Sequence, residues 1–175
     1  MTVAAPTVRG LAKLVGEEHM RFGRNVIIDD FAVLVASAAH PVTIGDYVHI
    51  TCHVSIVGGP VTLESFTNIG AASCLVAGSD DFMGHLIGPT VPAKFREVTR
   101  TGIIMRKHSV LGARCVVLPG VELAEGSAVG AGSVVTASTE PWCIYVGSPA
   151  RKVGIRDKWR ILVLEALLRK QETLP

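Results

Sequence analysis

Three histidines are the candidates for proton transfer in this chain: His40, His49 and His85. The unperturbed pKa of an imidazole is about 6.5, so a histidine can accept a proton at neutral pH. His49 ends a repeat unit, where its side chain is expected to point outward, and His85 follows Asp80 and Asp81 closely. The alternative for each histidine is a corner residue that bonds only solvent or backbone. No Ser-His-Asp spacing indicates a covalent step.

The polar residues around His85 each have two interpretations. Asp80 and Asp81 could orient a histidine through its second ring nitrogen or bind hydroxyl groups of a substrate; otherwise they form and cap a turn. Arg96 could bind a phosphate group, and the alternative is a solvated loop arginine. The remaining histidines are expected to pack at the surface, between subunits or in the leading segment: His53, His108 and His19.

A six-residue repeat must position these side chains, and it is clearest between residues 105 and 136. Every sixth residue is aliphatic, at Met105, Leu111, Val117, Leu123, Val129 and Val135. Small or compact side chains recur between them, at Ser109, Cys115, Val121, Ser127 and Ser133. A period of six fits neither an amphipathic helix nor an exposed strand. It predicts a β-solenoid with three strand-and-corner units per coil, in which every sixth side chain points inward.

The repeat is irregular in the first half of the chain and disappears once. It begins imperfectly near residue 22, is interrupted at His40–Pro41 and slips by one around Gly58–Pro60, which predicts about five coils. It vanishes between residues 78 and 102, a segment that mixes acidic, basic and aromatic residues. We expect an ordered loop that projects from one corner, and a disordered insertion is the alternative.

The expected organisation has three parts: a leader over 1–21, the solenoid over 22–153 with the loop inserted, and a C-terminal helix over 154–175. The final segment is rich in helix formers and carries an apolar stripe that includes Leu164 and Leu167. Such a helix is expected to cap the open end of the solenoid, because an uncovered strand edge promotes aggregation.

Composition limits the function classes. Hydrophobic residues make up 49% of the 175 residues and aromatic residues only 5%, so the core is aliphatic and some apolar surface is expected between subunits. A net charge of +2 without a basic run argues against nucleic acid. The start lacks the apolar core of a signal peptide, and no run reaches transmembrane length, which argues against membrane insertion. Four scattered cysteines without C-x-x-C pairs indicate a reducing cytoplasm.

Three motifs resemble the hexapeptide-repeat acyltransferases, the family with a left-handed parallel β-helix: Leu118–Val121, Gly130–Thr136 and Gly147–Val153. Within that family, Ile44–Ile50 and Ser79–Phe82 are similar to sugar O-acetyltransferases of the galactoside and polysaccharide-antigen type. The resemblance implies direct acetyl transfer from acetyl-CoA to a hydroxyl or amino group of a sugar or nucleotide-sugar, with a histidine as general base. It also implies a homotrimer. The nine-residue separation of His40 and His49 resembles nucleotide-sugar N-acetyltransferases, although Pro41 departs from their pattern.

The same resemblance implies where the donor binds. Ala113 and Ala131 would lie along the pantetheine arm, with Thr136 further along the groove, and the alternative for the two alanines is simple corner packing. Arg151 and Lys152 suit the anionic nucleotide end of acetyl-CoA, and the alternative is a solvated basic pair. No metal is expected.

Two other functions fit the same scaffold. A γ-carbonic-anhydrase-like hydratase needs two histidines five residues apart, whereas successive histidines here are 21, 9, 4, 32 and 23 apart. A non-catalytic scaffold is the second alternative, and it has no need of the acidic loop or the basic pair. The sequence leaves the identity of the acceptor open.

Overall fold

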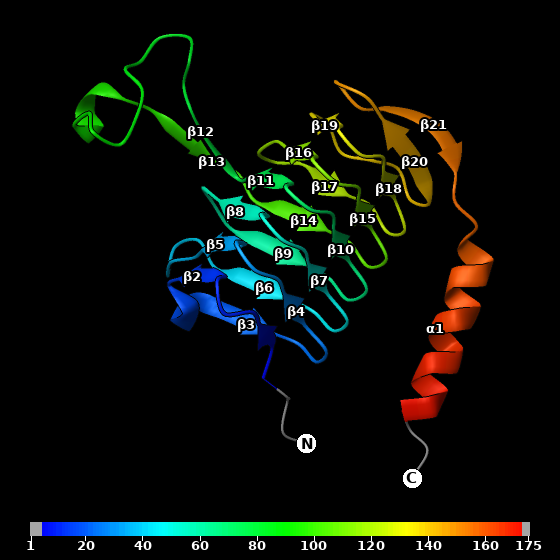
Figure 1. Cartoon of the computed structure of the whole chain (residues 1–175). Coiled ribbons are helices and arrows are strands. Elements are labelled where there is room, and N and C mark those ends of the chain that lie inside the picture. Colours follow the sequence, from blue (N-terminus) through cyan, green and yellow to red (C-terminus); the bar gives the residue numbers. More distant parts are fainter. Residues whose placement is uncertain (1–4, 173–175) are drawn as a thin grey trace.

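The computed structural model describes residues 5–172, which wind into a three-sided parallel β-solenoid with a projecting loop and one α-helix (Figure 1). Each regular coil contributes one short strand to each of three sheets, called here faces 1, 2 and 3. Strands of successive coils pair in parallel register within each face. The predicted class, an all-β solenoid with a C-terminal helix, is confirmed.

The three faces are built from strands of two to five residues. Face 1 contains β1 (Thr7–Val8), β4 (Ile27–Ile28), β7 (His49–Ile50), β10 (Asn68–Ile69), β15 (Val110–Leu111), β18 (Ala128–Val129), β20 (Cys143–Val146) and β21 (Arg151–Ile155). Face 2 contains β2 (Lys13–Val15), β5 (Val33–Val35), β8 (Ser55–Val57), β11 (Cys74–Val76), β16 (Val116–Val117) and β19 (Val134–Val135). Face 3 contains β3 (Met20–Phe22), β6 (Val42–Ile44), β9 (Val61–Leu63), β14 (Ile103–Met105) and β17 (Glu122–Leu123).

The solenoid has about seven coils, so the expectation of about five was wrong. Strands β1 and β2 lie inside the segment 1–21 that was expected to be a leader, and the solenoid therefore begins well before residue 22. The early coils are hidden in the sequence because extra residues, 16–19 and 36–41, are inserted between faces 2 and 3. These insertions break the six-residue frame, while the strands on either side keep their places in the sheets.

The repeat positions form the core. The six aliphatic positions from Met105 to Val135 are at most 3% exposed, and the small residues between them are equally buried. Stacking is close at the corners, because a Cβ added at Gly112 would lie 2.5 Å from the backbone nitrogen of Ala131 in the next coil. The aliphatic columns therefore make a rigid frame on which loops of any sequence can be mounted.

Helix α1 (Lys158–Glu172) lies along the side of the solenoid instead of capping its end (Figure 1). It packs at the corner between faces 3 and 1, where Glu165 bonds His108. The last strand, β20, pairs instead with antiparallel β21, which covers the edge that the helix was expected to protect. Leu164 and Leu167 are more than half exposed, so these two residues of the predicted stripe do not face the solenoid.

Candidate active site

The irregular segments of the chain gather at one corner of the solenoid. Residues 16–19, 36–41 and 58–60 and the long segment 78–102 all lie where face 2 leads into face 3. The long segment forms an antiparallel stem, β12 (Gly78–Asp80) and β13 (Val98–Arg100), with a turn of 3-10 helix at Ala93–Phe95. It projects from the corner and is called here the corner loop (Figure 1).

The stem of the corner loop fixes the acidic side chains at its base. The backbone N–H of Asp81 donates to the carbonyl oxygen of Glu97 at 2.9 Å, which extends the stem by one residue pair. Nη1 of Arg96 lies 3.7 Å from Oδ1 of Asp80, and both side chains are about four-fifths buried. Asp80, Asp81 and Glu97 therefore sit on a braced segment, whereas the residues between Asp81 and Arg96 form an open lobe.

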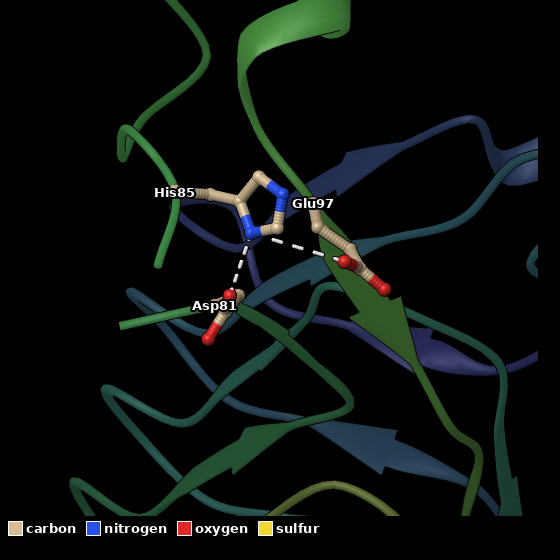
Figure 2. A group of neighbouring side chains, drawn as sticks. All are labelled: Asp81, His85 and Glu97. Atoms are coloured by element: carbon tan, nitrogen blue, oxygen red, sulfur yellow. Dashed lines mark hydrogen bonds and ion pairs between the residues drawn. The ribbon is translucent and has the colours of Figure 1, made fainter. Parts of the chain in front are cut away.

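His85 and Asp81 form a hydrogen-bonded dyad in this loop. Nδ1 of His85 lies 2.6 Å from Oδ2 of Asp81 and 3.8 Å from Oε2 of Glu97, as Figure 2 shows. The backbone N–H of Met83 donates to the other oxygen of Asp81 at 2.8 Å. The bond to Asp81 raises the pKa of His85 above its usual value, and the same bond lowers the pKa of Asp81. Since Nδ1 faces the carboxylates, Nε2 is the nitrogen left for a substrate.

A cavity of about 600 Å³ opens beside this dyad, and it is lined by Ser79, Asp80, Asp81, Phe82, Met83, Glu97 and Thr99. Its walls combine carboxylates and hydroxyls with apolar side chains, as small-molecule sites do. Buried atoms next to it, Oδ1 of Asp80 and Nε of Arg96, have no hydrogen-bond partner among the described residues. A polar ligand would supply partners for both.

His40 belongs to the same corner, one coil region away from the loop. It follows β5 and lines a cavity of about 260 Å³ together with Ser37, Gly58 and Arg100. The guanidinium of Arg100 bonds the carbonyl oxygen of Gly58, and Nδ1 of His40 is buried without a described partner. His40 and the corner loop are therefore neighbours through Arg100, which the sequence alone did not indicate.

His49 lies elsewhere, on the outer side of face 1 in strand β7. Its Nε2 bonds Oδ2 of Asp29 at 2.8 Å, and Oδ1 of Asp29 lies 3.9 Å from Nε of Arg9. Face 1 is the side of the solenoid opposite the corner between faces 2 and 3. A single chain therefore does not bring His49 together with His85 or His40.

The candidate donor-binding residues lie at a third place. Ala113 and Ala131 are exposed at the corner between faces 1 and 2, in successive coils, and Thr136 is exposed just after β19. Arg151 and Lys152 begin strand β21 at the end of face 1 and are exposed. Lys152 pairs with Glu140 at 2.7 Å. These residues line one edge and the end of the solenoid, away from the corner loop.

Residues 107–137 match the family model described as the hexapeptide repeat of succinyl-transferase. A dTDP-4-amino-4,6-dideoxy-D-glucose acyltransferase of Escherichia coli is 34% identical over 160 residues, which cover 90% of this chain and 82% of that protein. The crystal structure of AntD, an N-acyltransferase from Bacillus cereus in complex with dTDP and coenzyme A, superposes with a TM-score of 0.87 at 34% identity, covering 93% of this chain and 87% of AntD.

The chain belongs to the hexapeptide-repeat acyltransferases. The resemblance drawn from the three motifs is confirmed, and so is the enzyme class. A third relative, WbbJ of Escherichia coli K12, is named as a lipopolysaccharide biosynthesis O-acetyl transferase; it is 28% identical over 138 residues, which cover 77% of this chain and 67% of WbbJ. Both N- and O-acyl transfer thus occur among relatives of this acyltransferase. Within residues 5–172, no helix of the acyltransferase is long and apolar enough to span a membrane.

One histidine of this acyltransferase has a structural position that the sequence did not indicate. His108 was expected at the surface or between subunits, but it is 5% exposed, stacks on Phe66 and bonds Glu165 of α1 at 2.8 Å. Burial alone would raise the pKa of Glu165; bonds from Lys107, Arg169 and His108 outweigh burial and lower it to about 2. This pair anchors the helix.

Sequence reasoning also missed the partners of the candidate histidines. Asp29 is 20 residues from His49, and the two meet because β4 and β7 are neighbours in face 1. Glu97 reaches His85 because the stem of the corner loop is antiparallel. Neither contact has a signal in the local sequence, since both depend on which coils and strands lie side by side.

Proposed function

We propose that this acyltransferase moves an acyl group from acyl-CoA to the amino group of a nucleotide-linked deoxysugar. Support comes from relatives that align over more than four-fifths of both chains. One is named for dTDP-4-amino-4,6-dideoxy-D-glucose, and AntD was crystallised with that sugar nucleotide and coenzyme A. Acetyl is the acyl group expected from the motifs, and AntD was also crystallised with 3-hydroxybutyryl-CoA.

The observation that carries the proposal is the His85–Asp81 dyad beside the 600 Å³ cavity. With the Nδ1 proton donated to Asp81, Nε2 of His85 is a proton acceptor directed away from the carboxylates. The amine attacks the thioester carbonyl, the C–N bond forms and the amine proton moves to Nε2. The C–S bond then breaks, and the CoA thiolate takes up a proton. No covalent acyl-enzyme is required.

The remaining polar groups of the corner loop suit the acceptor. Asp80 and Asp81 offer carboxylate oxygens for sugar hydroxyl and amino groups. Arg96 offers a guanidinium for a phosphate of the nucleotide, and its Nε is among the buried atoms without a described partner. Binding of a sugar phosphate would therefore satisfy groups that the protein alone leaves unsatisfied.

The donor is proposed to bind along Ala113 and Ala131, with Arg151 and Lys152 at its nucleotide end. In one chain, face 2 separates this edge from the corner loop. A thioester held there would reach a corner loop most directly on a neighbouring copy. This geometry supports the predicted homotrimer, in which each site combines the loop of one chain with the donor edge of another.

A hydroxyl acceptor is the second candidate, because WbbJ is named as an O-acetyl transferase. The same dyad would serve it, with the hydroxyl proton moving to Nε2 of His85. The two candidates differ in the acceptor atom alone, so a matched pair of sugars separates them.

The test is a release assay for the CoA thiol. Acetyl-CoA and 3-hydroxybutyryl-CoA are each offered with dTDP-4-amino-4,6-dideoxyglucose or with the 4-hydroxy analogue. We expect thiol release with the amino sugar and little with the hydroxy sugar, together with a product whose mass has increased by one acyl group. Turnover of the hydroxy sugar alone would establish O-acylation. No turnover of either sugar nucleotide, with CoA binding intact, would overturn the proposed acceptor class.

A further inference from the structure

Two carboxylates converge on a single nitrogen in the corner loop. Oδ2 of Asp81 and Oε2 of Glu97 face Nδ1 of His85 at 2.6 Å and 3.8 Å (Figure 2). Nδ1 can donate one proton, and Asp81 takes it. Glu97 therefore carries a negative charge directed at a group that another carboxylate already occupies. A cation at the meeting point would satisfy all three.

We propose that Asp81, His85 and Glu97 bind one Zn²⁺ ion. The three ligand atoms lie within 4.8 Å of one another. Ligands of a tetrahedral Zn²⁺ at about 2.1 Å stand about 3.4 Å apart. The closure needed is small, and Glu97, whose side chain is 68% exposed, is free to rotate inward.

The surroundings of the three ligands fit a metal site. The Met83 N–H holds the second oxygen of Asp81 at 2.8 Å, which aims Oδ2 toward the meeting point in the way that outer bonds orient ligating carboxylates. The cavity beside Asp81 and Glu97 leaves room for water as a fourth ligand. One imidazole with two carboxylates favours Zn²⁺, Co²⁺ or Ni²⁺ over Mg²⁺, which prefers oxygen ligands alone.

Zinc in this site would oppose catalysis. A metal on Nδ1 displaces the proton shared with Asp81, so a neutral imidazole then keeps its one proton on Nε2. Nε2 becomes a donor and can no longer accept the proton of the attacking amine. This inhibitory effect rests on the proposed role of His85 as base, whereas zinc binding itself does not.

The His49–Asp29 pair supplies a matched control. Its distance of 2.8 Å is similar, but the third group near it is the cation Arg9, 3.9 Å from Asp29. A guanidinium repels a divalent metal where Glu97 attracts it. The two pairs therefore share a histidine and an aspartate and differ in the sign of the third charge.

Calorimetric titration of the purified protein with Zn²⁺ tests the binding. We expect one Zn²⁺ per chain in the wild type and in His49→Gln, and loss of this binding in His85→Gln and in Glu97→Gln. Circular dichroism confirms that each variant is folded. Absence of binding to the wild type, or unchanged binding in both loop variants, would overturn the site.

Inhibition is measured separately, as the rate with Zn²⁺ relative to the metal-free rate of the same variant. Wild type should lose most of its acyl transfer when the site is filled, and Glu97→Gln should be much less sensitive. If zinc binds without slowing transfer, the inhibitory role is overturned while the metal site stands. If no acceptor is ever turned over, the proposed function fails, and the calorimetric result is unaffected.

Discussion

The corner loop and the outer side of face 1 each carry a histidine–aspartate pair, and the two differ in what surrounds them. His85 and Asp81 are 2.6 Å apart, beside a 600 Å³ cavity and a second carboxylate. His49 and Asp29 are 2.8 Å apart, with Arg9 as the neighbouring charge. The pair itself is therefore no sign of catalysis. What distinguishes the corner loop is space for a substrate and polar atoms that still need partners.

The pairs also use different ring nitrogens. Asp81 bonds Nδ1 of His85, which leaves Nε2, the outer nitrogen, for a substrate. Asp29 bonds Nε2 of His49, so the outer nitrogen is already engaged and Nδ1 lies nearer the backbone. A bound acceptor reaches Nε2 more easily than Nδ1, and this favours His85 as the base.

Replacing each histidine by glutamine gives the largest expected contrast. We expect His85→Gln to lower kcat/KM for the acceptor by about 100- to 1,000-fold, the usual contribution of a general base. His49→Gln should change it by about twofold or less, as substitutions outside a site do. Steady-state rates of CoA release measure both.

Thermal melting of the two variants is the control for folding. The reverse order, with His49→Gln severely impaired and His85→Gln active, would move the base to face 1. It would also assign the corner loop to acceptor binding alone.

The aspartates should show the same contrast at a smaller scale. Asp81→Asn removes the carboxylate that holds His85 in its base tautomer, and we expect kcat to fall by about 10- to 100-fold. Asp29→Asn is expected to leave kcat nearly unchanged. A loss confined to KM in Asp81→Asn would show that Asp81 binds the acceptor and does not orient the histidine.

A third pair, His108 with Glu165, shows what burial does to the same contact. Glu165 is 8% exposed, and its pKa is lowered from 4.5 to about 2. Because the folded-state pKa is depressed, its contribution to stability is present above about pH 4.5 and is lost as the pH falls toward 2. We expect Glu165→Gln to reduce the free energy of unfolding by about 2 kcal/mol at pH 7.

Urea unfolding of wild type and Glu165→Gln at pH 7, 4.5 and 3 measures this difference, which should shrink as the pH falls. A difference that stays constant down to pH 3 would mean that Glu165 contributes by packing and not by charge. Acyl transfer at pH 7 should survive in the folded variant, because helix α1 carries none of the proposed catalytic groups.

The frame of this molecule is readable from sequence because its physics repeats. Side chains at Leu111, Val117 and Leu123 occupy equivalent places in neighbouring faces, so one period predicts the burial of all of them. The coil count failed where that regularity fails, at the inserted residues 16–19 and 36–41. Helix α1 was predicted as a helix from composition. Its position was not, since a carboxylate–imidazole contact 57 residues apart decides it.

The candidate site was readable only in part. Asp80, Asp81 and His85 were singled out because they are close in sequence, and the structure keeps them together. Glu97 was not singled out, because it joins them through the antiparallel stem. The nine-residue spacing of His40 and His49 suggested a pair, but the chain turns a corner between them and places them on different sides of the solenoid.

The last and smallest contrast separates acceptor from donor. Arg151 and Lys152 lie on β21 at the end of face 1, far along the chain from the corner loop. Changing both to alanine should raise KM for acyl-CoA by about fivefold, because an exposed ion pair contributes about 1 kcal/mol or less. KM for the acceptor should stay within about twofold.

Dephospho-CoA thioesters sharpen this experiment, since they lack the 3′-phosphate. If the basic pair binds that phosphate, the double variant should lose little additional affinity for the dephospho donor, whereas the wild type should lose about as much as the variant already has. A larger rise in acceptor KM than in donor KM would instead assign Arg151 and Lys152 to the nucleotide-sugar. The donor edge would then have to be sought away from face 1.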